Sequence, residues 1–132
     1  MREARPALRV FLWSRLALWV LAAGTVLAFE DRLNPRRGPW DTPRLHELGA
    51  AVDVWARWDS NWYLRIAESG YDWPSVTPAF FPLYPLLVGG LGRVLGGHYL
   101  LAGLTVSLTA AAVAFVLLHR LVLLRLDRPV AS

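Results

Sequence analysis

The stretch from Arg57 to Tyr71, RWDSNWYLRIAESGY, holds the residues of this chain that are best suited to chemistry. It places Asp59 and several charged side chains among tryptophans, between segments that are apolar enough to enter a bilayer. Tryptophan favours the level where hydrocarbon meets water. A second motif, FFPLYP, follows nine residues after Tyr71 and covers Phe80 to Pro85. A carboxylate held at this level is well placed to act on a lipid-linked substrate.

Asp59 is the candidate catalytic residue. A carboxylate that neighbours such as Trp58 and Trp62 partly remove from water is a better proton acceptor. A general base of this kind would suit the activation of a sugar hydroxyl. The alternative is structural: Asp59 could be the N-cap of a helix that starts at Ser60, its side chain accepting a hydrogen bond from the amide of Asn61 or Trp62. Spacing alone leaves both interpretations open.

Arg57 and Arg65 are candidate phosphate-binding residues. A guanidinium group presents a planar fork of donors that matches two phosphate oxygens, and its charge would stabilise a departing phosphate. The same arginines could instead contact anionic headgroups or pair with nearby acids. Those acids are Asp53, Asp59 and Glu68, and Glu68 follows Arg65 by the three residues that bring side chains together on a helix.

The tryptophans of this region have two possible roles. They could stack on a sugar ring or an isoprenoid chain, or they could form an interfacial belt that needs no ligand. The four clustered rings are Trp55, Trp58, Trp62 and Trp73.

The segment from His46 to Glu68 has few helix breakers, and its aromatic residues recur at steps of three and four. This spacing predicts one amphipathic helix that lies in the plane of the interface. The residues expected on its common face are Trp55, Trp58, Asp59, Trp62 and Ile66.

Composition points to a membrane. Of the 132 residues 55% are hydrophobic, and the mean hydropathy is +0.36. The net charge is +4, yet every basic residue is an arginine and most of them sit beside apolar runs, so we expect no nucleic acid as a partner. The absence of cysteine excludes disulfides and thiolate metal sites. The histidines are too scattered for zinc and the acids lack a calcium loop, so no metal or cofactor is expected.

The apolar pattern predicts an all-α membrane protein with two transmembrane helices flanking an outer-face loop that carries short interfacial helices. The spans are expected at about residues 10–29 and 100–118, each near the roughly 20 residues that a bilayer core requires. The outer loop covers about 30–78 and is rich in proline and glycine. Residues 79–97 form an interfacial or re-entrant helix. If this last segment also crosses, the chain has three spans instead.

Flanking arginines predict the orientation of the two spans. Arg5 and Arg9, with Arg2, precede the first span, and Arg120, Arg125 and Arg128 follow the second. Positively charged flanks stay in the cytoplasm, so both ends are expected there, and charge placement favours two spans over three. Arg15, near the start of the first apolar run, would snorkel toward the interface. A cleaved signal peptide is the alternative for this run, but its apolar stretch is long for that purpose.

Two motifs together resemble a known family, the PIG-V type mannosyltransferases and their bacterial relatives. These belong to the GT-C class of polytopic membrane glycosyltransferases, and the resemblance covers the N-terminal part of the family. An apolar segment precedes the motifs, as the first span does in that family. The matching residues are Arg57, Trp58 and Asp59, then Trp62 to Ala67, Gly70 and Tyr71, and finally Ala79 to Leu87.

The resemblance implies inverting transfer of a sugar, usually mannose, from a polyprenyl-phosphate donor to an acceptor hydroxyl on the outer face of the membrane. It implies that Asp59 is the catalytic residue, with Arg57, Trp62 and Tyr63 as motif residues near the site. Together with the two residues suggested by their chemistry, the predicted substrate-binding set is Arg57, Trp58, Trp62, Tyr63 and Arg65.

The expected location is the bacterial plasma membrane, with the active face outside the cytoplasm and with membrane lipids and a lipid-linked sugar donor as partners. Family members run to several hundred residues and many spans. The 132 residues are therefore expected to be an incomplete piece, inactive alone, that needs the remaining transmembrane portion or a homo-oligomer. The rival interpretation is a small non-catalytic membrane protein that binds lipid or a partner protein. A lipid-phosphate hydrolase or transporter would be expected to carry a basic, histidine-rich motif that this sequence lacks.

Overall fold

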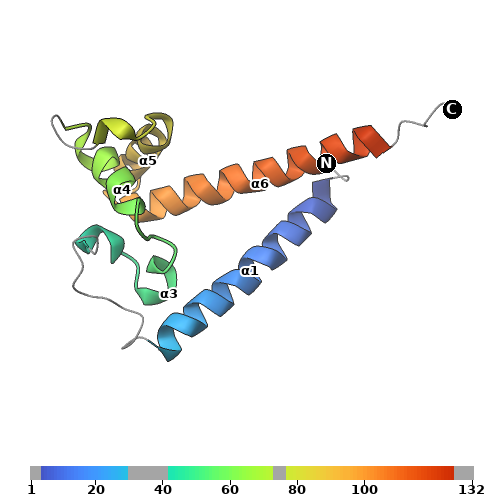
Figure 1. Ribbon diagram of the computed structural model, residues 1–132, viewed down its shortest axis with the longest axis horizontal. Coiled ribbons are helices and arrows are strands. Elements are labelled where there is room, and N and C mark those ends of the chain that lie inside the picture. Colours follow the sequence, from blue (N-terminus) through green and yellow to red (C-terminus); the bar gives the residue numbers. More distant parts are fainter. Residues whose placement is uncertain (1–3, 30–41, 73–76, 127–132) are drawn as a thin grey trace. The chain divides into compact units, whose positions relative to one another are not determined.

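The computed structural model describes residues 4–29, 42–72 and 77–126, and Figure 1 shows its helices in order along the chain. These residues form α-helices and short 3₁₀ helices, with no strand among them, so the predicted all-α fold class is confirmed. Loop residues 30–41 and Trp73 lie outside the described residues. The elements are α1 (Ala4–Ala28), η1 (Pro43–Leu45), α3 (Ala50–Asp53), α4 (Ser60–Ser69), η2 (Thr77–Ala79), α5 (Leu83–Val94) and α6 (Tyr99–Leu126).

Helices α1 and α6 are long and apolar enough to cross a membrane. They contain 25 and 28 residues, and at 1.5 Å per residue each exceeds the roughly 30 Å of a hydrocarbon core. Both extend beyond the predicted spans because the helical backbone continues into the arginine-bearing flanks. Helix α5 has 12 residues and measures only about 18 Å, too short to cross. Within the described ranges the chain thus has two candidate spans.

The chain divides into two compact units, Met1–Val20 with Ser107–Ser132, and Leu21–Val106. In the first unit α1 and α6 meet through the rings of Phe11 and Phe115, whose centroids are 5.3 Å apart. The Arg15 guanidinium lies over the Phe11 ring, 5.5 Å from its centroid. The Arg15 side chain therefore leans toward the N-terminus of α1, and its snorkelling toward the interface stays a prediction.

The second unit is built on the packing of α4 against α5 and η1. Two glycines of α5 allow close contacts, Gly89 with α4 and Gly92 with the start of α6. A Cβ atom on Gly89 would stand 2.7 Å from the carbonyl oxygen of Ala67 on α4, and one on Gly92 would meet the Tyr99 ring. The buried residues that form the hydrophobic core cluster of the unit are Leu45, Ala56, Leu64, Ala67, Val88, Leu100 and Ala102.

Two acidic side chains stabilise the segment before α4 by accepting hydrogen bonds from backbone amides. The carboxylate of Asp53, which is 2% exposed, accepts a hydrogen bond from the Leu48 amide at 2.9 Å. The carboxylate of Glu47 accepts one from the Leu100 amide, also at 2.9 Å, in the first turn of α6. A carboxylate at a helix N-terminus satisfies an amide that has no partner within the helix and interacts favourably with the helix dipole. These bonds connect the loop before the candidate site to the start of a candidate span.

The predicted single helix from His46 to Glu68 is wrong. Helix α3 ends at Asp53 and α4 begins at Ser60, so Trp55, Trp58 and Asp59 lie between helices and share no helical face with the residues of α4. The interruption has a local cause, because Trp58 adopts a φ of +48°, a conformation that no α-helix contains. Only Trp62 and Ile66 of the expected face lie on one helix.

We predict that Gly89→Ala destabilises the second unit whereas Gly90→Ala does not. The added methyl group at position 89 meets a backbone oxygen that cannot move independently, and such overpacking costs about 1–3 kcal/mol. At position 90 a Cβ atom finds nothing within 4 Å, and alanine is the better helix former. Thermal unfolding in detergent, followed by tryptophan fluorescence, should give a lower Tm for Gly89→Ala alone. Equal Tm values would contradict the packing described here.

Candidate functional site

Asp59 lies at the N-terminus of α4, and its carboxylate makes no hydrogen bond or ion pair with the described residues. It is the N-cap residue, with φ −63° and ψ −15°, but its side chain makes no capping hydrogen bond. The carboxylate is exposed, and it has no hydrogen bond or ion pair with another described residue. The cap interpretation of this side chain is therefore wrong. The carboxylate is available for a ligand.

Backbone carbonyls replace the side-chain cap. The Arg57 oxygen accepts from the Ser60 amide at 3.0 Å, the Trp58 oxygen from the Asn61 amide at 3.2 Å, and the Asp59 oxygen from the Tyr63 amide at 3.1 Å. The first two bonds are three-residue turns and the third is a regular α-helical bond, and together they satisfy amides of the first helical turn. This arrangement explains why the carboxylate is not needed to start the helix.

Trp58 combines a strained backbone with an exposed ring. Its φ of +48° lies in the left-handed region that side chains with a Cβ atom avoid, and its side chain is 84% exposed. Trp58 therefore gains little packing in return for this conformation. Strained residues of this type cluster at binding sites, which supports a role for Trp58 toward a ligand. The predicted removal of water from Asp59 by Trp58 is not seen among the described residues, since both side chains are exposed.

Trp62 and Tyr63 join the two sequence motifs. The Phe80 ring stacks on Trp62 with centroids 6.2 Å apart, and it meets Tyr63 edge-on at 5.0 Å. Tyr63 also meets Tyr84 of α5 edge-on at 5.1 Å. Aromatic pairs at these separations stabilise beyond the burial of their area. The motif that contains Asp59 and the motif that contains Phe80 thus form one packed structure.

The two predicted phosphate-binding arginines differ in their surroundings. Arg65 donates to the Asp72 carboxylate at 2.7 Å, and its guanidinium lies 5.8 Å from the centre of the Trp62 ring. Arg57 is half-buried and makes no side-chain hydrogen bond or ion pair to any part of the chain that the structure describes. Arg57, two residues from Asp59, is therefore the better placed cation for an incoming anion.

Two of the three acids expected to pair with these arginines have other partners. Glu68 pairs with Arg44 of η1, and the buried Asp53 accepts from the main chain. Arg44 and Asp72 were not among the predicted site residues. The spacing of residues in the sequence could not predict the Arg44–Glu68 ion pair, because the two residues are 24 positions apart and meet only when η1 packs on α4.

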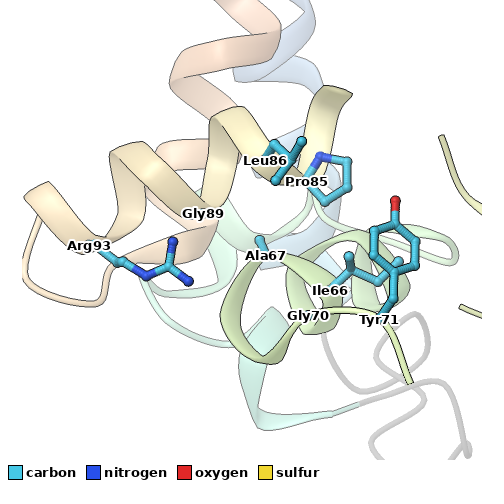
Figure 2. Close-up of a pocket in the computed structure, with 8 residues that line it drawn as sticks. All are labelled: Ile66, Ala67, Gly70, Tyr71, Pro85, Leu86, Gly89 and Arg93. Atoms are coloured by element: carbon cyan, nitrogen blue, oxygen red, sulfur yellow. The ribbon is translucent and has the colours of Figure 1, made fainter. Parts of the chain in front are cut away.

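A cavity of about 110 Å³ lies between α4 and α5 (Figure 2). Its lining is mostly apolar, with the Arg93 guanidinium at one side and the Tyr71 ring at the other. The lining residues are Ile66, Ala67, Gly70, Tyr71, Pro85, Leu86, Gly89 and Arg93. Asp59 does not line this cavity. In the described ranges no three His, Asp or Glu side chains are grouped as a metal site would require.

Comparison of the chain with protein-family models, with curated proteins and with solved structures gave no match. The resemblance to the PIG-V type family stays a prediction from the two motifs.

We predict that Asp59→Ala leaves the stability of the fold unchanged, in contrast to Asp53→Ala. No side-chain cap is lost at Asp59, so the roughly 1 kcal/mol that a lost cap costs should not appear. Asp53→Ala removes the acceptor of the part-buried Leu48 amide, which costs about 1–3 kcal/mol. Thermal unfolding of both variants provides the measurement. A fall in Tm for Asp59→Ala as large as that for Asp53→Ala would show that the carboxylate is structural.

We also predict that Trp58→Gly retains or raises Tm. Glycine adopts positive φ without the roughly 1–2 kcal/mol that a side chain costs there, and the exposed ring contributes little packing. Tyr63→Ala is the matched comparison, because it removes a ring that packs on both Phe80 and Tyr84 and should lower stability by about 3 kcal/mol. If Trp58→Gly were as destabilising as Tyr63→Ala, the Trp58 ring would have a packing role.

Proposed function

We propose that this chain is the N-terminal part of a GT-C type membrane glycosyltransferase. Its reaction is the transfer of a sugar, mannose by the motif resemblance, from a polyprenyl-phosphate donor to an acceptor hydroxyl. The observation that carries the proposal is that the two motifs behind the resemblance pack on each other through Phe80 and leave the Asp59 carboxylate uncommitted. A carboxylate with only a capping or ion-pairing role would be expected to have a partner, and Asp59 has none among the described residues.

The residues suit each part of this reaction. Asp59 accepts the proton of the acceptor hydroxyl, whose oxygen forms a bond to the anomeric carbon of the donor sugar. The bond from that carbon to the phosphate oxygen breaks, and the polyprenyl phosphate departs with its electron pair. The Arg57 guanidinium, without a partner in the described chain, stabilises the charge that develops on this phosphate. Inversion at the anomeric carbon follows from attack opposite the leaving group.

The arrangement of the first unit supports an outer-face site. Arg5 and Arg9 lie at the start of α1, and Arg120 lies near the end of α6. Since the Phe11 and Phe115 rings bring these two helix segments together, one cytoplasmic surface accommodates both arginine groups. The residues between the two spans then lie on the opposite side. Our proposal accordingly locates the protein in a bacterial plasma membrane, with Asp59 outside the cytoplasm.

The test is sugar transfer by the full-length protein reconstituted in liposomes with polyprenyl-phosphate mannose. Asp59→Asn should lower the rate about 10²–10⁴-fold, the usual contribution of a general base. Glu68→Gln is the matched control, because Glu68 is also an exposed acid of this region but already pairs with Arg44. It should keep most activity. Unchanged transfer in Asp59→Asn would refute the role of Asp59, and a wild-type protein that binds the lipid without transfer would favour the non-catalytic interpretation.

A further inference from the structure

Helix α5 has two apolar faces, and only one of them is covered. The inner face packs on α4 and on the first turns of α6, and Val88 on this face is completely buried. The outer face carries Leu83, Leu86, Leu87 and Val94, which are 69%, 68%, 50% and 82% exposed. Leu86, Leu87 and Val94 follow Leu83 by three, four and eleven positions, so the four residues form one stripe along the helix. We call them the α5 stripe.

The α5 stripe is held close to the end of a candidate span. Helix α6 begins at Tyr99, five residues after Val94. The Tyr84 hydroxyl donates to the Gly103 carbonyl at 3.1 Å, and Gly92 lies against the Tyr99 ring, so α5 is attached to the first turns of α6. If α6 crosses a bilayer, its first turns lie at the membrane surface, and α5, which is attached to those turns, then lies close to the same surface. An exposed apolar stripe in this position fits a helix that lies in the interface.

Arg93 lies beside the stripe at the edge of the helix. It is exposed, it lines the cavity between α4 and α5 together with Leu86, and Figure 2 shows both residues on the same helix. No other described residue pairs with its guanidinium. Arginine next to an apolar helix face places its charge at the level of lipid phosphates while its stem lies along the hydrocarbon.

We propose that the α5 stripe docks on the membrane leaflet in which α6 begins, with Arg93 bound to the phosphate of an anionic lipid headgroup. The docking fixes the depth of α4, and hence of Asp59, relative to the membrane surface, because α4 packs on the inner face of α5. The inference does not depend on the sugar-transfer reaction. It requires only that α6 enters a bilayer.

The absence of cysteine makes a site-directed spin-label test simple. Single-cysteine variants of the full chain at Leu87 and Val94 are labelled in phospholipid nanodiscs, with the exposed Ser69 of α4 as the control position. We expect the labels at 87 and 94 to collide more with oxygen than with a water-soluble nickel chelate, and the label at 69 to show the reverse. Preference for the nickel chelate at 87 and 94 would overturn the proposal. Low access to both reagents would mean that protein covers the stripe, which also overturns it.

The role of Arg93 needs a second measurement. The label at Val94 is compared in phosphatidylcholine nanodiscs with and without phosphatidylglycerol, in the parent chain and with Arg93→Gln. Anionic lipid should increase the ratio of oxygen to nickel collisions in the parent chain and leave Arg93→Gln unchanged. An equal response in both would show that Arg93 does not bind the headgroup. Retained tryptophan fluorescence in each labelled variant confirms that α4 and α5 stay packed.

Discussion

The close approach of α4 and α5 holds the candidate site together. It depends on Gly89, since any larger residue would press on the Ala67 carbonyl. With the two helices at this separation, the Phe80 ring contacts both Trp62 and Tyr63. The Tyr71 hydroxyl also donates a hydrogen bond to the Phe80 carbonyl at 2.8 Å. The two motifs can then act as one structure.

The start of α4 determines what Asp59 is free to do. Carbonyl groups of the preceding residues satisfy the first amides of the helix, so the carboxylate is not needed for the fold. The positive φ of Trp58 accompanies this arrangement and is not compensated by burial of its ring. A strained aromatic residue and an uncommitted carboxylate at adjacent positions are hard to explain by stability and easier to explain by ligand binding.

Hydropathy was sufficient to predict the all-α fold and two helices of spanning length, because the length of a span follows directly from consecutive apolar residues. Periodicity failed between His46 and Glu68 because the break at Trp58 is a backbone conformation that side-chain spacing does not encode. The contact of Glu47 with Leu100 was also beyond prediction, since the two residues are 53 positions apart and meet only through tertiary packing. The sequence predicted that Asp59 directly precedes a helix and left its side chain as either an N-cap or a free carboxylate. The structure shows that the side chain makes no capping hydrogen bond.

The most direct test of the central claim is a cryo-electron microscopy structure of the full-length protein with a polyprenyl-phosphate sugar analogue and an acceptor. The account predicts that a carboxylate oxygen of Asp59 lies about 2.6–3.2 Å from the acceptor hydroxyl that faces the anomeric carbon. A donor bound elsewhere, with Asp59 directed into open water, would contradict it.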